Sequence, residues 1–235
     1  MRARFARHAA TYERHGGLQR AIAQRLARML PELAQPSVLE IGCGTGFLTQ
    51  HLFARYPSGR FLITDIAGEM VEACAARFAN GAQARFQLLD GEAPPETDQF
   101  DLIASSMVIH WFDDPLAGLK RLQARLAPGG ELLYAVSGPD FLEEWSTVMH
   151  AQGFAIEAPR TGELPGILEE ERQEVAYGSA RQLLADLQGT GAARPLGEGK
   201  RLTPGRLKRA VRQFEAEHGG AATWHILYGR LGSVA

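Results

Sequence analysis

The 235-residue sequence has little cysteine, little net charge and no long apolar run. Its two cysteines, Cys43 and Cys74, lack the spacing of a zinc site, which predicts free thiols and no metal centre. The formal net charge of −2 gives no general attraction toward nucleic acid or an anionic membrane. No apolar segment follows the amino terminus, and no run of about 18 apolar residues occurs. We therefore expect a soluble, cytoplasmic protein with no nucleic-acid or membrane partner.

Short apolar runs alternate with helical segments along the first 140 residues. Five runs are predicted to be buried strands: Val38–Ile41, Phe61–Thr64, Arg85–Leu89, Leu102–Ser105 and Leu132–Val136. Helical periodicity occurs at 18–30, Phe47–Arg55, Gly68–Phe78 and Leu116–Leu126. Such alternation is typical of a parallel sheet that is covered by helices on both faces.

The alternation ends after about residue 138. Residues 141–152, 180–188 and 204–217 are predicted to be helical, and Thr223–Leu231 is predicted to be a last strand. Pro128-Gly129-Gly130 predicts a turn between the preceding helix and the fifth strand.

A glycine-rich loop joins the first predicted strand to a helix. Val38–Ile41 runs directly into Gly42-Cys43-Gly44-Thr45-Gly46. Gly42 and Gly44 let the backbone turn tightly and come close to a ligand, and Gly46 allows close packing of helix on strand. The spacing is G-x-G-x-G and differs from the G-x-G-x-x-G that seats a pyrophosphate. The loop alone is weak evidence of a ligand site.

Polar residues stand near the ends of the predicted strands. Glu40 lies in the first strand, Asp65 closes the second, Asp90 and Gly91 close the third, and Ser106 follows the fourth. Ligands bind at the carboxyl edge of open α/β sheets, where these residues would meet. A carboxylate at Asp65 can accept hydrogen bonds from both hydroxyls of a ribose, and one at Asp90 from an adenine amino group.

With Leu126-Ala127-Pro128-Gly129-Gly130, these features resemble the motifs of class I S-adenosylmethionine-dependent methyltransferases over residues 37–137. The resemblance implies that the loop backbone lies against the methionine portion of S-adenosylmethionine and that Asp65 holds its ribose. Asp90 and Gly91 would frame the adenine, and Met70 could pack on its ring. The expected cofactor-binding residues are Glu40, Gly42, Gly44, Gly46, Asp65, Met70, Asp90, Gly91 and Ser106.

The same resemblance implies a Rossmann-like α/β fold, with a mostly parallel seven-stranded sheet, flanking helices and a small helical cap. We expect a single domain over residues 1–235. Amino-terminal helices or a lid would occupy 1–34, the cofactor-binding core 35–137, and the cap helices and last strands 138–235.

The flanking segments resemble a narrower family, the malonyl-acyl-carrier-protein O-methyltransferases of biotin synthesis. The similar segments are 5–12, 18–26, Ser106–Trp111, Leu187–Ala192, Leu202–Leu207 and Thr223–Gly229. One departure lies between Gly138 and Trp145, where the chain looks shorter by roughly a helix and lacks the family's Asn-Arg-Phe-like segment. The departure concerns the substrate side and leaves the cofactor side intact.

The implied reaction needs few catalytic groups. A malonyl carboxylate, with a pKa of roughly 4, is ionised at pH 7, so its methylation needs no general base. The protein then has to align this carboxylate with the sulfonium methyl and exclude water. We expect Tyr12, in an entrance segment before the first strong helix, to belong to a lid over the site. Methylation of carbon or of a phenol would need a base, for which His110 is the candidate; otherwise His110 is a loop histidine bonded to backbone.

One segment is strongly basic although the whole chain is not. Residues 194–212 hold seven cationic side chains and one acidic side chain, so their net charge is 7 − 1 = +6. Acyl carrier proteins are acidic, and Arg201, Arg206 and Arg209 are the candidates for docking one. A solvated helix face is the alternative, and the acidic stretch Glu169-Glu170-Glu171 could pair with these charges.

Three functions are therefore open. The first is methylation of the free carboxyl of a malonyl thioester on a carrier protein. The second is methylation of another small acid or of a quinone-like ring with the same cofactor half. The third is a non-catalytic S-adenosylmethionine-binding subunit, which the intact glycine loop with both Asp65 and Asp90 argues against.

Overall fold

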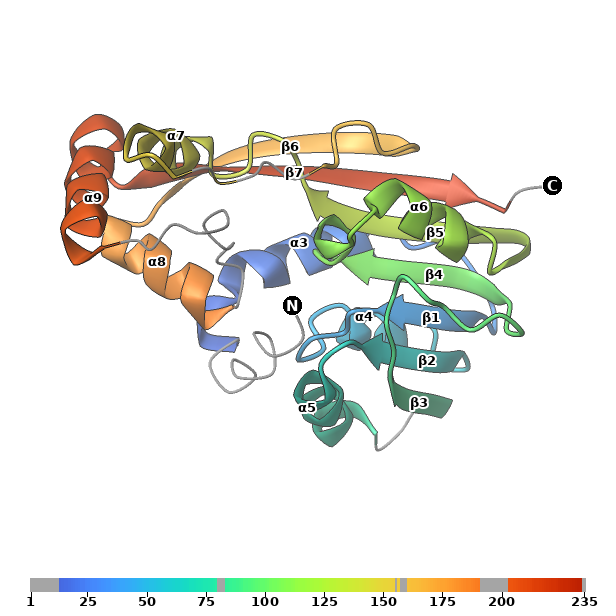
Figure 1. Ribbon diagram of the computed structural model, residues 1–235. Coiled ribbons are helices and arrows are strands. Elements are labelled where there is room, and N and C mark those ends of the chain that lie inside the picture. The colour runs from blue at the N-terminus through green and yellow to red at the C-terminus, as the bar shows by residue number, and fades with distance from the viewer. Residues whose placement is uncertain (1–12, 80–82, 155, 157–159, 191–202, 234–235) are drawn as a thin grey trace.

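A computed structural model describes residues 13–79, 83–154, 156, 160–190 and 203–233 (Figure 1). One seven-stranded sheet with the strand order β3-β2-β1-β4-β5-β7-β6 runs through the molecule. The strands are β1 Ser37–Ile41, β2 Arg60–Asp65, β3 Gln83–Leu88, β4 Phe100–Ser106, β5 Leu126–Ser137, β6 Ile167–Ala176 and β7 Ala221–Gly232. The first five strands in this order are parallel, and β7 is antiparallel to both of its neighbours. The predicted fold class is confirmed.

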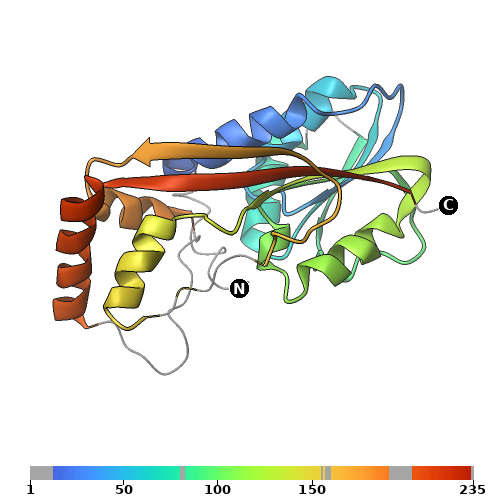
Figure 2. The same cartoon turned by 90° about the horizontal axis from the view of Figure 1, so that it is seen from above.

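Helices cover both faces of the sheet, because successive strand residues point to opposite sides. Leu133 of β5 packs in one apolar cluster with residues of α3 and α4, whereas Leu132 packs in another with residues of α6. The helices are α3 Gly17–Ala27, α4 Thr49–Arg55, α5 Gly68–Phe78, α6 Pro115–Gln123, α7 Glu143–Ala151, α8 Ala180–Gly189 and α9 Pro204–His218, with a 3₁₀ turn η1 at Ile109–Trp111. Helices α7, α8 and α9 gather where β7 begins (Figures 1 and 2).

Strand β6 is the element that the sequence pattern does not predict. It lies at the edge of the sheet and most of its side chains are exposed, so it lacks the apolar alternation of a buried strand. Its acidic run Glu169-Glu170-Glu171 is exposed or half-buried, which suits an edge that has to resist pairing with another chain.

The start of β5 also differs from the prediction. The predicted helix 116–126 ends at Gln123, because Leu126 pairs with Phe100 of β4 and thereby opens β5. The turn predicted at Pro128-Gly129-Gly130 is wrong. These residues form an irregularity within the strand, with a shift of register against β4 and a φ of 78° at Gly129.

The connection from β5 to α7 is short. Residues 138–142 alone separate Ser137 from Glu143, so no helix lies between the fifth strand and α7. Leu142 precedes the helix in the left-handed backbone region, with φ of 57°. The Glu144 carboxylate accepts hydrogen bonds from the Thr223 N–H at 2.8 Å and from the Thr223 hydroxyl at 2.5 Å, which ties α7 to the start of β7.

Cys43 and Cys74 are free thiols, as predicted, and both are buried. Within the described ranges, no helix has both the length and the apolar character that crossing a bilayer requires.

Candidate cofactor site

A cavity of about 320 Å³ opens at the carboxyl ends of β1, β2 and β4. Seven of the nine residues predicted for the cofactor line it: Gly42, Gly44, Asp65, Met70, Asp90, Gly91 and Ser106. Glu40 and Gly46 do not line it. The topology brings these residues together because the strands are parallel and end at one edge of the sheet.

Asp65 lies in the wall of this cavity with only 8% of its surface exposed. Its Oδ2 accepts the Gly44 N–H and its Oδ1 accepts the Ala67 N–H, each at 2.9 Å. Burial raises the pKa of Asp65, and the two backbone N–H groups oppose that rise. Each carboxylate oxygen has a second lone pair, so Asp65 can still accept a hydrogen bond from each of two vicinal hydroxyls.

Asp90 lies at the exposed side of the cavity, where its Oδ1 accepts the Glu92 N–H at 3.0 Å. Gly91 beside it is buried and packs closely. A Cβ atom at Gly91 would lie 2.5 Å from Cγ2 of Ile41 and 3.0 Å from Cζ of Phe112. The absent side chain therefore lets Ile41 and Phe112, which also line the cavity, pack against the backbone at Gly91.

Gly42 lines the cavity and in addition makes room for a neighbouring side chain. Its φ is 73°, in the region that favours glycine, and a Cβ atom there would lie 2.2 Å from Cγ2 of Val108. The absent side chain therefore makes room for Val108, which itself lines the cavity. At this glycine the absent side chain thus serves the packing of Val108, and the close approach of a ligand to the backbone stays a prediction.

Glu40 and Gly46 support the loop from below. A Cβ atom at Gly46 would lie 2.3 Å from Cε2 of Phe78, so this glycine lets the loop pack on α5. Glu40 is 1% exposed, and its Oε2 accepts the Thr49 hydroxyl at 2.7 Å. Burial raises the pKa of the Glu40 carboxyl well above its usual range. Neither residue lines the cavity, so we assign both to positioning of the loop.

The segment after β4 supplies five of the nine lining residues that were not predicted for the cofactor: Met107, Val108, Trp111, Phe112 and Asp113. Met107 has a φ of 61°, which is unusual for a residue other than glycine and is typical of functional sites. An apolar run directly after a strand at the ligand-binding edge is the signal that could have identified the four apolar residues among them.

His110 lies in the same segment but does not line the cavity. The backbone N–H of Ser137 donates to Nδ1 of His110 at 3.4 Å. Because a backbone N–H can only donate, Nδ1 is unprotonated and the ring proton lies on Nε2. In this tautomer Nδ1 already accepts the Ser137 N–H and Nε2 carries a proton, so neither nitrogen is available to take a proton from a substrate. This argues against the base role that methylation of carbon or a phenol would require.

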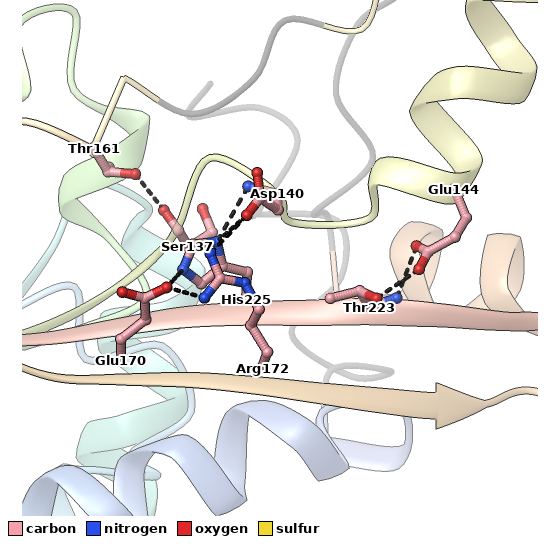
Figure 3. A network of polar contacts seen from close by, with 8 residues as sticks. All are labelled: Ser137, Asp140, Glu144, Thr161, Glu170, Arg172, Thr223 and His225. Atoms are coloured by element: carbon pink, nitrogen blue, oxygen red, sulfur yellow. Dashed lines mark hydrogen bonds and ion pairs between the residues drawn. The ribbon is translucent and has the colours of Figure 1, made fainter.

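A polar network holds the short connection after β5 (Figure 3). The Asp140 N–H donates to Nδ1 of His225 at 3.2 Å, and Nε2 of His225 lies 3.1 Å from Oε1 of Glu170. Arg172 bridges Glu170 and the Asp140 carboxylate, with 2.8 Å to the latter. Thr161 donates to the Ser137 carbonyl at 2.5 Å. The short connection is therefore held by a bonded network that joins β5, β6 and β7.

The basic residues of α9 lack the acidic partner that the sequence suggested. Glu169 and Glu171 pair with Arg25 of α3, and Glu170 pairs with Arg172 and His225. The proposed pairing with Arg206 and Arg209 is therefore wrong. Both arginines are exposed, and no carboxylate among the described residues forms an ion pair with them. Tyr12 and Arg201 lie outside the described residues.

Comparison with known proteins identifies the family. Residues 39–132 match the family model of a methyltransferase domain. The chain is 33% identical to the malonyl-[acyl-carrier protein] O-methyltransferase of Magnetococcus marinus, over 94% of this chain and 88% of that protein. The chain belongs to the malonyl-[acyl-carrier protein] O-methyltransferase family. It is an S-adenosylmethionine-dependent methyltransferase, as predicted.

A second relative of this methyltransferase is the biotin biosynthesis bifunctional protein BioCD of Bordetella avium. The two are 36% identical over 97% of this chain and 51% of the relative, so the chain spans about half of that protein. Two solved structures share the fold. YcgJ of Bacillus subtilis has a TM-score of 0.64 at 15% identity, and the match covers 92% of this chain and 99% of YcgJ. NodS of Bradyrhizobium japonicum is an N-methyltransferase solved with S-adenosylhomocysteine. It has a TM-score of 0.52 at 18% identity, and the match covers 95% of this chain and 87% of NodS.

Proposed function

We propose that this methyltransferase methylates the free carboxyl of a malonyl group carried by acyl carrier protein, as a step of biotin synthesis in the cytoplasm. The observation that carries the proposal is the cavity at the ends of β1, β2 and β4, which belongs to a chain of this family. The residues fit S-adenosylmethionine. Asp65 offers two acceptor sites for ribose hydroxyls, and Asp90 offers an acceptor at the exposed end for an adenine amino group.

The protein's contribution to the reaction is alignment and exclusion of water. When bound, S-adenosylmethionine supplies an electrophilic methyl group on a sulfonium. Val108, Trp111 and Phe112 give the cavity an apolar wall beside the glycine loop. An anionic carboxylate that attacks a cationic centre cancels charge, so an environment with little water favours the reaction. The ionised carboxyl needs no general base, which agrees with the donor tautomer of His110.

We assign the carrier-docking surface to the basic face of α9. Arg206, Lys208, Arg209 and Arg212 are exposed on this helix. The Arg206 guanidinium lies over the Phe154 ring at 5.6 Å, and Nε of Arg209 donates to Gln152 at 3.4 Å, so two of these side chains are held in place without losing their charge. An oriented cationic surface steers an acidic partner toward the site.

The test is transfer of a labelled methyl group from S-adenosylmethionine. The protein is incubated with malonyl-carrier protein, malonyl-coenzyme A and free malonate in parallel, and the labelled product is identified. We expect label on the malonyl thioesters and the fastest transfer to the carrier-bound form. Label on free malonate alone, or on none of the three, would refute the proposed substrate. Free malonate belongs in the panel because the short connection at 138–142 changes the substrate side.

A further inference from the structure

Two segments that lie apart in the chain meet at the Asp90 end of the cofactor cavity. Asp90, Gly91 and Glu92 line the cavity from the turn after β3, and Phe112 and Asp113 line it from the segment between η1 and α6. The whole of β4 separates the two segments in sequence, so tertiary contacts hold them together. The shape of this end of the cavity depends on those contacts.

The carboxylate of Glu92 joins the two segments. Its Oε2 accepts the Asp113 N–H at 2.9 Å, and its Oε1 accepts the Asp114 N–H at 3.4 Å and Nη2 of Arg121 at 3.1 Å. All three donors belong to α6 or to the residues before it, whereas the main chain of Glu92 belongs to the turn after β3. The Glu92 side chain is only 22% exposed, so these hydrogen bonds are partly shielded from water, which strengthens them.

The main chain of Glu92 holds the Asp90 carboxylate in turn. The Glu92 N–H donates to Oδ1 of Asp90 at 3.0 Å, and the Ala93 N–H donates to the Asp90 carbonyl at 3.0 Å, which closes the turn. In the part of the chain that the structure describes, no other group bonds to the Asp90 carboxylate. The direction of this exposed carboxylate therefore depends on where the Glu92 N–H is placed.

An apolar contact closes the same junction. A Cβ atom at Gly91 would lie 3.0 Å from Cζ of Phe112, and one at Gly118 of α6 would lie 2.3 Å from Cδ2 of the same ring. The Phe112 ring therefore packs on the turn after β3 at one glycine and on α6 at the other. The hydrogen bonds of Glu92 and the packing of Phe112 together fix the spacing of the two segments.

We propose that Glu92 is a positioning residue for the adenine of S-adenosylmethionine. Its carboxylate sets the distance between the turn of Asp90 and the wall at Phe112, and its N–H sets the direction in which Asp90 accepts a hydrogen bond. A ligand site is most selective when the residues that touch the ligand are held by contacts behind them. The inference rests on the proposed function in one point, the assignment of Asp90 to the adenine amino group. It does not depend on the methyl acceptor.

Binding of two ligands tests the inference without turnover. The first is S-adenosylhomocysteine, the cofactor without its methyl group, and the second is its purine analogue, in which hydrogen replaces the 6-amino group of the base. Calorimetry gives both Kd values, and their ratio measures recognition of the amino group. We expect the wild type to bind the purine analogue about two- to tenfold more weakly, as for loss of one hydrogen bond. Asp90→Ala should bind the two ligands about equally.

Glu92→Ala should lower this ratio toward one although Asp90 is intact. Damage to the fold alone would weaken both ligands equally and leave the ratio at its wild-type value. Glu92→Gln should give an intermediate ratio, because its amide oxygen can still accept one backbone N–H. It also keeps the test open if Glu92→Ala does not fold. Glu96→Ala, an exposed acid of the same loop that does not line the cavity, is the matched control and should keep the wild-type ratio.

A double variant distinguishes positioning from direct contact with the base. If Glu92 acts through Asp90, the effects of Asp90→Ala and Glu92→Ala on the Kd of S-adenosylhomocysteine should be less than additive. Additive effects would overturn the positioning role.

The outcomes also separate this inference from the proposed function. A wild-type ratio that is lost in Asp90→Ala but retained in Glu92→Ala and Glu92→Gln would overturn the role of Glu92 and leave Asp90 assigned to the adenine. A ratio near one in the wild type, or one that Asp90→Ala does not change, would refute the assignment of Asp90 and the role of Glu92 together. None of these results depends on whether a malonyl thioester accepts the methyl group.

Discussion

Asp65 is oriented by the protein itself. The N–H groups of Gly44 and Ala67 each hold one oxygen of its carboxylate, so the free lone pairs have fixed directions before a ligand arrives. Such preorganisation reduces the entropy that binding has to overcome. The residue that sequence spacing selects for the ribose is thus held at both carboxylate oxygens by the backbone.

Asp65→Ala should weaken S-adenosylmethionine binding by about 1.5–3 kcal/mol, the range for hydrogen bonds to a charged group, or roughly 10- to 150-fold in Kd. Calorimetry measures the affinity, and circular dichroism checks that the fold is retained. Asp98→Ala, an exposed acid outside the cavity, should bind normally. Equal affinity in Asp65→Ala and wild type would contradict the ribose assignment.

Glu40 should make stability depend on pH. Because burial raises its pKa in the folded protein, the folded state retains a proton that the unfolded state loses above ~4.3. The contribution of Glu40 to the free energy of unfolding is therefore fully present below pH ~4.3 and is lost as the pH rises through the raised pKa. In Glu40→Gln this loss should be absent, while the Thr49 hydroxyl still finds an acceptor. Urea unfolding of both proteins from pH 5 upward measures the difference, and parallel curves would show that Glu40 is ionised in the fold.

His110 should tolerate glutamine. A glutamine can accept the Ser137 N–H with its oxygen and donate with its amide nitrogen, so it reproduces the hydrogen bonds of the Nε2–H tautomer. We expect His110→Gln to keep kcat within a few-fold of wild type and His110→Ala to lose more. Steady-state kinetics of both variants and the wild type, measured as a function of pH, test this expectation. Loss of activity in both variants, together with loss of a pH-dependent step, would indicate a general base.

At the scale of elements, α9 and β6 carry opposite charge but do not neutralise each other. Glu169, Glu170 and Glu171 of β6 are paired with Arg25, Arg172 and His225 and not with α9, so the basic face of α9 keeps its charge for a partner. The α9 helix itself is well terminated. Thr203 caps its first turn, and Gly219 ends it in the left-handed conformation.

Arg206→Glu/Arg209→Glu should raise the KM for malonyl-carrier protein strongly and that for malonyl-coenzyme A only slightly. Electrostatic steering is lost in this variant, whereas the reacting groups are unchanged. Added salt should mimic the substitution in wild type, because exposed charges are screened over ~8–10 Å. Arg60→Glu/Arg85→Glu changes the net charge equally on β2 and β3, away from α9, and is the control. Equal effects on both substrates would instead place α9 in the active site.

At the scale of the whole molecule, the cap and the core share one sheet. β7 pairs with β5 over Glu131–Ser137 and with β6 along most of its length, so the strands after residue 138 complete the sheet begun by β1. The aromatic core of the cap, with Trp145 packed edge-on against Phe214, adjoins the same apolar cluster as α3. We therefore propose that the chain is one domain, as the sequence predicts.

A single domain should unfold in one transition. In Trp111→Phe, fluorescence reports from Trp145 and Trp224 in the cap, whereas far-ultraviolet circular dichroism reports from the whole chain. The two signals should give the same midpoint in urea, as cooperative unfolding requires. A fluorescence midpoint clearly below that of circular dichroism would show that the cap unfolds separately and would contradict the single domain.

Local pattern predicted most of the fold and of the cofactor site. Strands β1, β2 and β4 are buried on both faces and read as continuous apolar runs, and their ends carry Asp65 and Ser106 to the common edge. Where burial is weak the pattern fails. The exposed edge strand β6 has no apolar alternation, and the Pro128–Gly130 irregularity depends on pairing with β4.

The sequence alone determined the strand–helix alternation, the glycine loop and the acids at the strand ends, because each depends on residues that are neighbours in the chain. The tertiary structure decided which side chains share a space. Val108 opposite Gly42, Ser137 on His110, and Glu92 with Asp113 are pairs far apart in sequence. Their contacts follow from the packing of whole elements, since a hydrogen bond or a steric contact depends on distances of a few ångströms that no local periodicity specifies.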